Sequence, residues 1–493
     1  MRTKSGYPQH IQHDDATTFI DVEKIDMILE SPHGAFKDVF APEISQPPTY
    51  RVVGTLGMVS IVYLFTCGGP IGSEPIVSAG GPLVGMICLL LYPFLVTIPY
   101  AYIVAELCSA FPEDGGFTIW VLNAFGPYWG FQVGYWSWIS GVVRTALIPE
   151  TILDLFLSFY DMEIESKAMR FFVKAGMAIV LTVPACFGTK NVARLSCLLL
   201  VVVIVPFLTY TVWAYTGARD FDDLFQVRHE TTVYDRERAD VETEGSIEID
   251  WTVLVNTLFH KFDGIYMASV FGGEVMNPAR TYPRAIFFTV LLAVATYLVP
   301  IPASIVADDL SWVFFGRDAY PFMAERIGGS FLKTFILIAS VGGALGTFIS
   351  GIYLKAFQVS GMAVNRLLPS ILARRRSRFE SPNHAIIGTA IVTIALLPVS
   401  FDDLLHMSNA FAAAVEFTII VAAMRLRMTL PYIPRPTKVP GGVPGLLMFA
   451  AVPGVVLGYI LVHTFMTSLI ATLLMVGLLA VGLVYGVWST RWS

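Results

Sequence analysis

The stretch WTVLVNTLFHKFDGIYMASVFGGEVM, residues 251–276, is long and apolar enough to span a bilayer, yet residues that do not suit lipid interrupt it near its middle. The interrupting residues are His260, Lys261, Asp263 and Gly264. A second interruption, CGGPIGSE at residues 67–74, divides the first apolar stretch of the chain. Backbone groups that such breaks free in lipid must find partners inside the protein. Two interrupted spans in corresponding halves are the best sequence indication of a secondary transporter whose substrate site lies at the membrane midplane.

The composition favours a membrane protein. Hydrophobic residues make up 55% of the 493 residues and charged residues 14%, whereas soluble proteins carry about 25% charged residues. The mean hydropathy is +0.65. The net charge of −6 arises partly from a local cluster, because eleven of the 38 acidic residues lie between Asp220 and Asp250. We expect the lipid bilayer as a partner and no nucleic acid, since no basic patch is present.

Apolar runs predict an all-α polytopic protein with about twelve transmembrane helices. Spans three and eight exceed the bilayer thickness and should tilt. The predicted spans are 52–80, 82–110, 123–158, 168–188, 192–216, 251–276, 284–306, 330–364, 384–401, 404–425, 445–463 and 465–488.

Basic residues predict the orientation of these spans. Arginine and lysine gather in the segments after spans four, six, eight and ten, which lie on one side if the spans alternate. The positive-inside rule places that side in the cytoplasm. We therefore expect a cytoplasmic tail at 1–51, a transporter domain at 52–488 and a cytoplasmic C-terminus at 489–493, in the plasma membrane. The acidic segment 217–250 would then be an extracellular loop, which we interpret as a flexible linker because it lacks apolar periodicity.

The two interruptions fall in spans one and six, the offset expected for two inverted five-helix repeats followed by two helices. Half-helix ends carry partial charges of both signs and can hold a carboxylate and an ammonium together. Gly68 and Gly69 lack a Cβ, so a ligand can approach their backbone closely. We place the substrate, a small molecule, between these two glycines and Phe262, Asp263 and Gly264.

Several motifs resemble those of the amino acid–polyamine–organocation superfamily. Two of them, CGGPIGSE and GPYWGFQ, look most like the plant and protozoan polyamine-uptake transporters. This resemblance covers roughly residues 50–490 and implies a LeuT-like fold and proton-coupled uptake of polyamines or amino acids by alternating access, with the proton as coupling ion and no other cofactor. The motifs are AEL at 105–107, PEDGGF at 112–117, GGEVMNPARTYP at 272–283, GPYWGFQ at 126–132 and PRPTKVPGG at 434–442.

The chain departs from the polyamine branch at charged positions. The branch tends to have an acid in span three, where this chain has Arg144, and acids in span eight near Gly351 and Lys355. Asp263, Glu416 and Glu74 match the branch. Matched acids suit a cationic or zwitterionic ligand, whereas Arg144 and Lys355 repel a di- or tri-cation. A cationic or neutral amino acid, carried by uptake or by exchange, therefore stands beside a polyamine as substrate.

Each candidate residue has a functional and a structural interpretation. Asp263, Glu416 and His260 are candidates for proton coupling, and Lys355 is a candidate to replace a sodium ion. Asp263 could instead pair with Lys261 or Lys355, and Glu416 could pair with Arg144, itself a counter-ion. The substrate-binding candidates are Gly68, Gly69, Gly72, Glu74, Arg144, Phe262, Asp263 and Gly264.

Other classes of function fit the sequence less well. A channel needs a continuous polar pore or a ring of carbonyls or charges, and only isolated breaks occur. A membrane enzyme needs a catalytic cluster or a metal site, but the eight histidines are scattered and no metal-ligand spacing is present. We expect neither an enzyme nor a bound metal. A nutrient-sensing transceptor shares every feature of a transporter except net flux.

Overall fold

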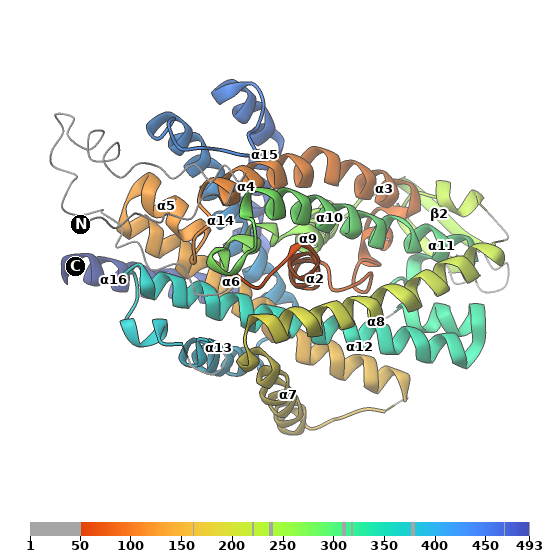
Figure 1. Cartoon of the computed structure of the whole chain (residues 1–493). Helices are drawn as coiled ribbons and strands as arrows, with labels where there is room; N and C mark the ends of the chain where they lie inside the picture. Colours follow the sequence, from red (N-terminus) through yellow and green to blue (C-terminus); the bar gives the residue numbers. More distant parts are fainter. Residues whose placement is uncertain are drawn as a thin grey trace, which may run out of the picture. The chain divides into compact units, whose positions relative to one another are not determined.

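The structure is a computed structural model in which the chain is almost entirely helical outside a short hairpin (Figure 1). The predicted tail 1–51 lies outside the described residues except for Arg51. The structure describes residues 51–160, 162–218, 221–235, 240–307, 312–316, 319–375, 380–467 and 469–492.

The helices follow one another along the chain, and a hairpin lies in the connection between α8 and α9. They are α2 (Thr55–Thr66), α3 (Pro75–Tyr92), α4 (Ile98–Ala110), α5 (Phe117–Phe125), α6 (Pro127–Phe159), α7 (Lys167–Thr182), α8 (Thr189–Thr216), α9 (Trp251–Phe262), α10 (Pro278–Leu298), α11 (Pro300–Ala307), α12 (Ala319–Val364), α13 (Asn383–Leu396), α14 (Phe401–Thr429), α15 (Gly442–Thr467) and α16 (Leu469–Trp492).

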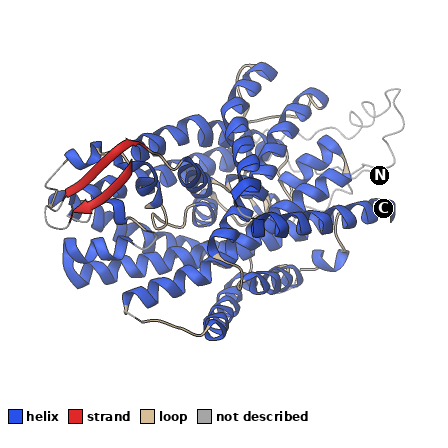
Figure 2. Ribbon diagram, turned by 180° about the vertical axis from the view of Figure 1, so that it is seen from behind, coloured by secondary structure: helices blue, strands red, loops and turns tan. Residues whose placement is uncertain are grey.

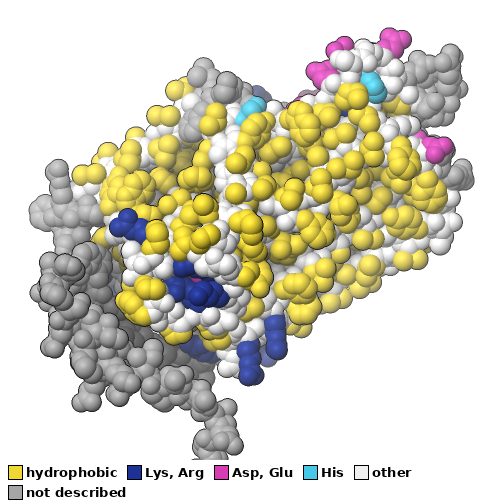
Figure 3. Space-filling model, turned by 90° about the horizontal axis from the view of Figure 1, so that it is seen from above, with side chains coloured by type: hydrophobic (Ala, Val, Ile, Leu, Met, Phe, Trp, Pro, Cys, Tyr) yellow, Lys and Arg dark blue, Asp and Glu magenta, His cyan; other side chains and the backbone are white. Residues whose placement is uncertain are grey.

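Seven helical stretches among the described residues are long and apolar enough to cross a membrane. Figure 3 shows a broad band of hydrophobic side chains between one end rich in lysine and arginine and another where acidic side chains gather. The chain is therefore an integral membrane protein. The seven stretches are Pro75–Ala110, Lys167–Phe187, Thr189–Thr216, Pro278–Ala307, Ala319–Val364, Phe401–Thr429 and Gly442–Thr464.

Glycines mark where two of these long helices bend. In α3, Gly81 has φ +81°, and a Cβ there would lie 2.7 Å from the backbone of Val227. The six residues before the bend belong with α2 to predicted span one, and span two follows it. In α12, Gly328 and Gly329 leave helical geometry one residue before the predicted start of span eight. Both bends lie at predicted span boundaries.

The most buried helices form the centre of the bundle. In α12 and α14, 72% of the most apolar 18-residue window is buried, compared with 22% for α7. Helix α6 packs against both α12 and α14, and α8 packs against α12 (Figure 1). The centre is therefore built by helices from both halves of the chain, and it surrounds the ends of α2 and α9.

The acidic segment 217–250 contains a β-hairpin, so its interpretation as a flexible linker is wrong. Strands β1 (His229–Asp235) and β2 (Asp240–Ile247) pair antiparallel, with Thr232 opposite Thr243 (Figure 2). β-Branched residues in β1 favour a strand despite the surrounding charge.

Both flanks of the hairpin are fixed to α3 close to its bend. The Arg228 N–H donates to the Gly80 carbonyl at 3.2 Å, and the Asp250 N–H donates to the Ala79 carbonyl at 2.9 Å. The flanks of the hairpin therefore link the half-helix 75–80 of span one to the start of α9.

Candidate functional site

The ends of α2 and α9 meet at the side chain of Arg144, which comes from the middle of α6. Carbonyl groups in the last turn of a helix lack intrahelical donors and attract positive charge. The Arg144 Nη2 donates to the carbonyl of Thr66 at 2.7 Å and to that of His260 at 3.1 Å. Its guanidinium carbon lies 5.3 Å from the centre of the Phe65 ring, at the distance of a cation–π contact. The Arg144 guanidinium therefore stabilises the C-terminal ends of both interrupted helices.

Arg144 also forms an ion pair with Asp263, the residue that follows α9. The distance from Nη1 to Oδ2 is 3.1 Å, and the two residues are only 5% and 4% exposed. A buried charge must be paired, because an isolated one is very costly. In the structure Asp263 pairs with Arg144 rather than with Lys261 or Lys355. Lys261 instead donates to the carbonyl of Ile71 at 2.6 Å.

The glycines at the two breaks adopt backbone conformations that other residues avoid. Gly68 has φ +66°, and a Cβ there would lie 2.3 Å from the Thr347 hydroxyl. Gly264 has φ +106°, and its Cβ would lie 2.6 Å from the Phe65 ring. At Gly69 the nearest atom to an added Cβ belongs to Val203, at 3.2 Å. Close packing of the protein on itself therefore explains glycine at these positions without a ligand.

Helix α14 brings two further polar groups to the end of α9. The Glu416 carboxyl lies within hydrogen-bonding range of the Asp263 carboxyl and of the Gly264 backbone. The ring of His260 lies 3.3 Å from Asn409 Oδ1. Glu416 and Asp263 thus form a pair of acids next to Arg144.

A small cavity adjoins this pair of acids. Its volume is about 10 Å³, close to the smallest cavity that holds one water molecule. Phe262 forms part of its wall and packs against Tyr92 and Tyr297, with ring centres 5.7 and 5.4 Å away. The cavity does not admit a diamine or an amino acid, so the junction is closed in this conformation. Its lining residues are Tyr92, Val96, Thr97, Tyr100, Phe259, Phe262, Asp263, Glu416 and Pro453.

Lys355 lies next to the junction, on α12. It is 1% exposed, and its Nζ lies 2.8 Å from the Ser137 hydroxyl and 3.4 Å from Gln358 Oε1. It also lies 5.6 Å from the centre of the Phe65 ring. Phe65 therefore contacts both buried cations, and the site holds two acids and two bases.

Two predicted site residues occupy the outer part of the first break. Glu74 is buried at the N-terminus of α3, where it acts on the hydroxyl of Tyr320 electrostatically. Gly72 lies beside Lys261, whose Nζ would be 2.9 Å from a Cβ at that position. The structure therefore places Gly72 beside Lys261 and Glu74 beside Tyr320 rather than at the pair of acids.

An ion cluster joins three connecting segments at one end of the bundle. Arg375 contacts Asp114 at 2.8 Å and Glu274 at 2.9 Å, and it lies 5.0 Å from the centre of the Phe357 ring. Burial disfavours the charge of Arg375, but the carboxylates of Asp114 and Glu274 outweigh burial and hold the pKa of Arg375 above its ordinary value. This cluster, which we name the Arg375 cluster, links the α4–α5 connection to the segments that follow α9 and α12.

Glu106 of α4 lies at the centre of a second cluster. It pairs with Arg427 of α14 and, at 3.1 Å, with Arg435. Its Oε2 also accepts a hydrogen bond from the Val439 N–H at 2.8 Å. Glu106 therefore anchors the PRPTKVPGG segment to the bundle.

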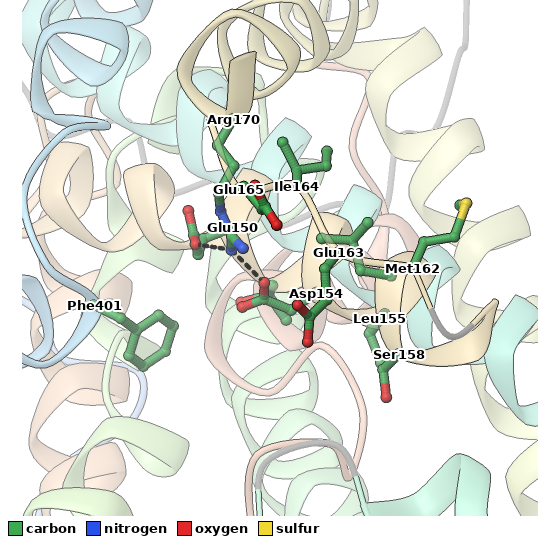
Figure 4. Close-up of a pocket in the computed structure, with 12 residues that line it drawn as sticks. Glu150, Asp154, Leu155, Ser158, Met162, Glu163, Ile164, Glu165, Arg170 and Phe401 are labelled. Atoms are coloured by element: carbon green, nitrogen blue, oxygen red, sulfur yellow. Dashed lines mark hydrogen bonds and ion pairs between the residues drawn. The ribbon is translucent and has the colours of Figure 1, made fainter. Parts of the chain in front are cut away.

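A larger pocket of about 540 Å³ lies where α6 ends and α7 begins (Figure 4). Arg170 projects between Glu150 and Asp154, with contacts of 2.5 and 2.6 Å, and Lys174 also pairs with Glu150. None of the predicted site residues lines this pocket. Glu150 and Asp154 of α6 are engaged by basic side chains of α7, and these ion pairs fix α6 to α7.

Sequence reasoning missed the contribution of predicted span two. Tyr92, Thr97 and Tyr100 line the cavity beside the pair of acids. Thr97 is the last residue of the π-helical turn Pro93–Thr97, and Tyr92 and Tyr100 flank it. In this turn the Ile98 N–H donates to the Pro93 carbonyl five residues back. The two prolines at 93 and 99 in one apolar run were the available signal, because proline removes helix hydrogen bonds. Such π-turns often occur at functional sites.

Comparison with known proteins gives the family of this chain. The profile of the amino acid permease family matches residues 56–486. The chain is 31% identical to the polyamine transporter RMV1 of Arabidopsis thaliana over 437 residues, which cover 88% of this chain and 84% of the relative. It is also 31% identical to the polyamine transporter PUT1 of Oryza sativa subsp. japonica, over 89% of this chain and 78% of that protein. The chain therefore belongs to the amino acid permease family and is a transporter rather than an enzyme.

Proposed function

We propose that this transporter takes up polyamines together with protons, by alternating access around the junction of α2 and α9. The observation that carries the proposal is Arg144, whose guanidinium binds two helix-end carbonyls and the Asp263 carboxylate. These acceptors form a cation site, and an alkylammonium group can use the same acceptors once Arg144 moves away. The relatives named as polyamine transporters support a polyamine as the ligand.

An amino acid is the second candidate substrate, and a specific observation favours it. Arg144 already neutralises Asp263, and the buried base Lys355 lies beside them, so a dication would add uncompensated charge to a buried site. A zwitterion adds none, and its carboxylate can pair with Arg144 while its ammonium pairs with Asp263. Competition between the two ligand classes separates these candidates.

The proposed architecture has twelve membrane crossings, in two inverted halves of five followed by two more. The support comes from the breaks, because α2 and α9 begin the two halves and both end at Arg144. Predicted spans one, three, six, nine and twelve correspond to α2, α6, α9, α13 and α16. These helices lie outside the seven long apolar stretches. Several of these are short or carry buried charges, which explains why length and apolarity alone do not identify them.

We place the protein in the plasma membrane with both termini in the cytoplasm. The lysine- and arginine-rich end in Figure 3 supports this orientation by the positive-inside rule. The Arg375 cluster then closes the cytoplasmic side, and the hairpin lies outside.

The experiment is uptake of labelled putrescine into proteoliposomes, with spermidine, arginine and leucine as competitors. We expect uptake to rise as the outside pH falls from about 7.5 to about 6, to collapse with a protonophore, and to need no sodium gradient. A nutrient sensor would bind putrescine without net flux, and that result would overturn the proposal.

The variant Arg144→Met tests the charge balance of the site. Because it removes one buried cation, it should shift the preference from arginine toward putrescine. The exposed Arg374→Gln is the matched control and should leave the preference unchanged. Stronger competition by arginine than by putrescine in the wild type, reversed in Arg144→Met, would establish the amino acid candidate.

A further inference from the structure

The two oxygens of Asp263 have different partners. Oδ2 accepts a hydrogen bond from Arg144 Nη1 at 3.1 Å. Oδ1 is buried and accepts no hydrogen bond from the donors of the described residues. The Glu416 carboxyl lies within hydrogen-bonding range of the Asp263 carboxyl. A carboxyl group is a donor only when it is protonated.

Two buried carboxyl groups in contact cannot both be ionised, so they share one proton. Arg144 stabilises the negative charge on Asp263, which assigns the proton to Glu416. A Glu416 O–H donated to Asp263 Oδ1 also provides the missing partner of that oxygen. The unpartnered Asp263 Oδ1 and the positive charge of Arg144 therefore both indicate a protonated Glu416 beside an ionised Asp263.

The surrounding charged and titratable groups support this assignment. Arg144 of α6 and Lys355 of α12 act on Asp263 as positive charges. Tyr92 of α3, Tyr100 of α4 and Tyr266 of the 3₁₀ turn Ile265–Ser269 face both acids. His260 of α9 faces Asn409 on α14. Burial disfavours a charge on either acid, but Lys355 and the hydrogen-bonded ion pair with Arg144 offset this at Asp263, which leaves the shared proton on Glu416.

The one-water cavity gives Glu416 a route for proton exchange. Thr97 and Tyr100 line it, and their buried hydroxyl oxygens, Oγ1 and Oη, have no hydrogen-bond partner among the described residues. A buried polar group without a partner is costly, and a water in a polar cavity of this size supplies one. The π-turn Pro93–Thr97 positions Thr97 at the wall of the cavity.

We propose that Glu416 carries the coupled proton, donates it to Asp263 Oδ1 in the closed state, and exchanges it through one water held by Thr97 and Tyr100. This inference rests on the proposed function and names the proton carrier of that same site. The proton stays on Glu416 while Asp263 turns to the ammonium of a ligand, so proton and ligand cross together. After the site opens inward and the ligand leaves, Glu416 passes the proton to the water, which leaves a glutamate that takes up another proton from outside. No oxidant or other reactant is needed.

The first test uses Glu416→Gln in proteoliposomes with putrescine and, in parallel, arginine. Glutamine keeps the shape and an N–H donor for Asp263 Oδ1 but cannot release a proton. We expect loss of pH-driven accumulation and of the internal acidification that a trapped pH dye records, while exchange of labelled for unlabelled substrate continues. Accumulation by Glu416→Gln with the wild-type pH dependence would overturn the proposal.

A second test does not depend on that variant folding well. Thr97→Val and Tyr100→Phe each remove one hydroxyl from the cavity, and their matched controls are the half-buried Thr209→Val and the exposed Tyr102→Phe. We expect the cavity variants to slow acidification at least several-fold relative to exchange, and the controls to match the wild type. Acidification equal to the wild type in both cavity variants would refute the water route.

Infrared spectroscopy of the purified protein separates failure of this inference from failure of the proposed function. A protonated carboxyl group gives a C=O stretching band that shifts in deuterium oxide, and this band should be missing in Glu416→Gln but present in the exposed variant Glu325→Gln. If wild-type vesicles take up neither substrate, the proposed function fails while the band still tests the proton on Glu416. A spectrum in which Glu416→Gln retains the whole band would refute the assignment.

Discussion

Replacement of Arg375 by glutamine should open the end of the bundle that the Arg375 cluster closes. The side chain joins Asp114, Glu274 and the Phe357 ring, which lie in or beside three different helices. Glutamine retains some hydrogen bonding but removes the positive charge. Glu274, with a side chain only 5% exposed, then loses its ion-pair partner.

The magnitude follows from the two ion contacts, of 2.8 and 2.9 Å. A hydrogen bond to a charged group contributes roughly 1.5–3 kcal/mol. The Arg375 side chain is 23% exposed, so water screens part of this interaction, and the two contacts share one cation. We therefore expect a loss of roughly 2–3 kcal/mol from the closed state, which changes the ratio of closed to open transporter about 30- to 150-fold.

Labelling of Cys67 measures this change. Cys67 follows α2 at the junction and is buried in the closed conformation. The other four cysteines, Cys88, Cys108, Cys186 and Cys197, are first replaced by serine. A membrane-impermeant maleimide applied in inside-out vesicles should then label Cys67 faster in Arg375→Gln.

The neighbouring Arg374→Gln is the matched control, because the Arg374 side chain is exposed and the substitution removes the same charge. Its labelling rate should equal that of the parent protein. If Arg375→Gln and Arg374→Gln label at the same rate while both are expressed and folded, the Arg375 cluster does not hold the closed state and the reasoning is wrong.

Further substitutions test the site and its support. Asp263→Asn should weaken putrescine competition about 10- to 150-fold, because a charged contact of roughly 1.5–3 kcal/mol is lost; an unchanged competition curve would contradict this. Gly264→Ala should lower the melting temperature in detergent, since its Cβ would meet the Phe65 ring at 2.6 Å, whereas Gly454→Ala, with open space around it, should not. Glu106→Gln should destabilise the fold by roughly 3–5 kcal/mol, because buried arginines lose their partner; equal melting temperatures for it and the exposed Glu325→Gln would argue against an anchoring role.

Features that depend on local sequence were predictable. Helix α8 begins three residues before the predicted span and ends at the same residue, because an apolar run determines its length. The bends at Gly81 and at Gly328–Gly329 lie at predicted boundaries, because glycine tolerates the conformation that a sharp change of direction requires. The ends of α2 and α9 were likewise predictable from Gly68 and Gly264.

Features that depend on tertiary contacts were not predictable. Arg144 and Asp263 are 119 positions apart, and Glu106 and Arg427 are 321 apart, so nothing in the local sequence indicates either pairing. Charge alone led to a linker in place of the hairpin, because the Thr-rich pattern of β1 was outweighed by its acidic surroundings. The short helix α5 was missed for a related reason, since it is too short to register as a span.

The position of Arg144 has a consequence for the transport cycle. A carrier with an unbalanced carboxylate at its centre cannot easily turn around without cargo, because a lone charge would have to cross a medium of low polarity. Such a protein returns only after it binds a substrate molecule on the other side of the membrane, so it works as an obligatory one-for-one exchanger. Here the guanidinium neutralises Asp263 when no ligand is bound, so the unloaded protein can return to its starting orientation. We therefore expect net filling of a vesicle that contains no internal substrate at the outset.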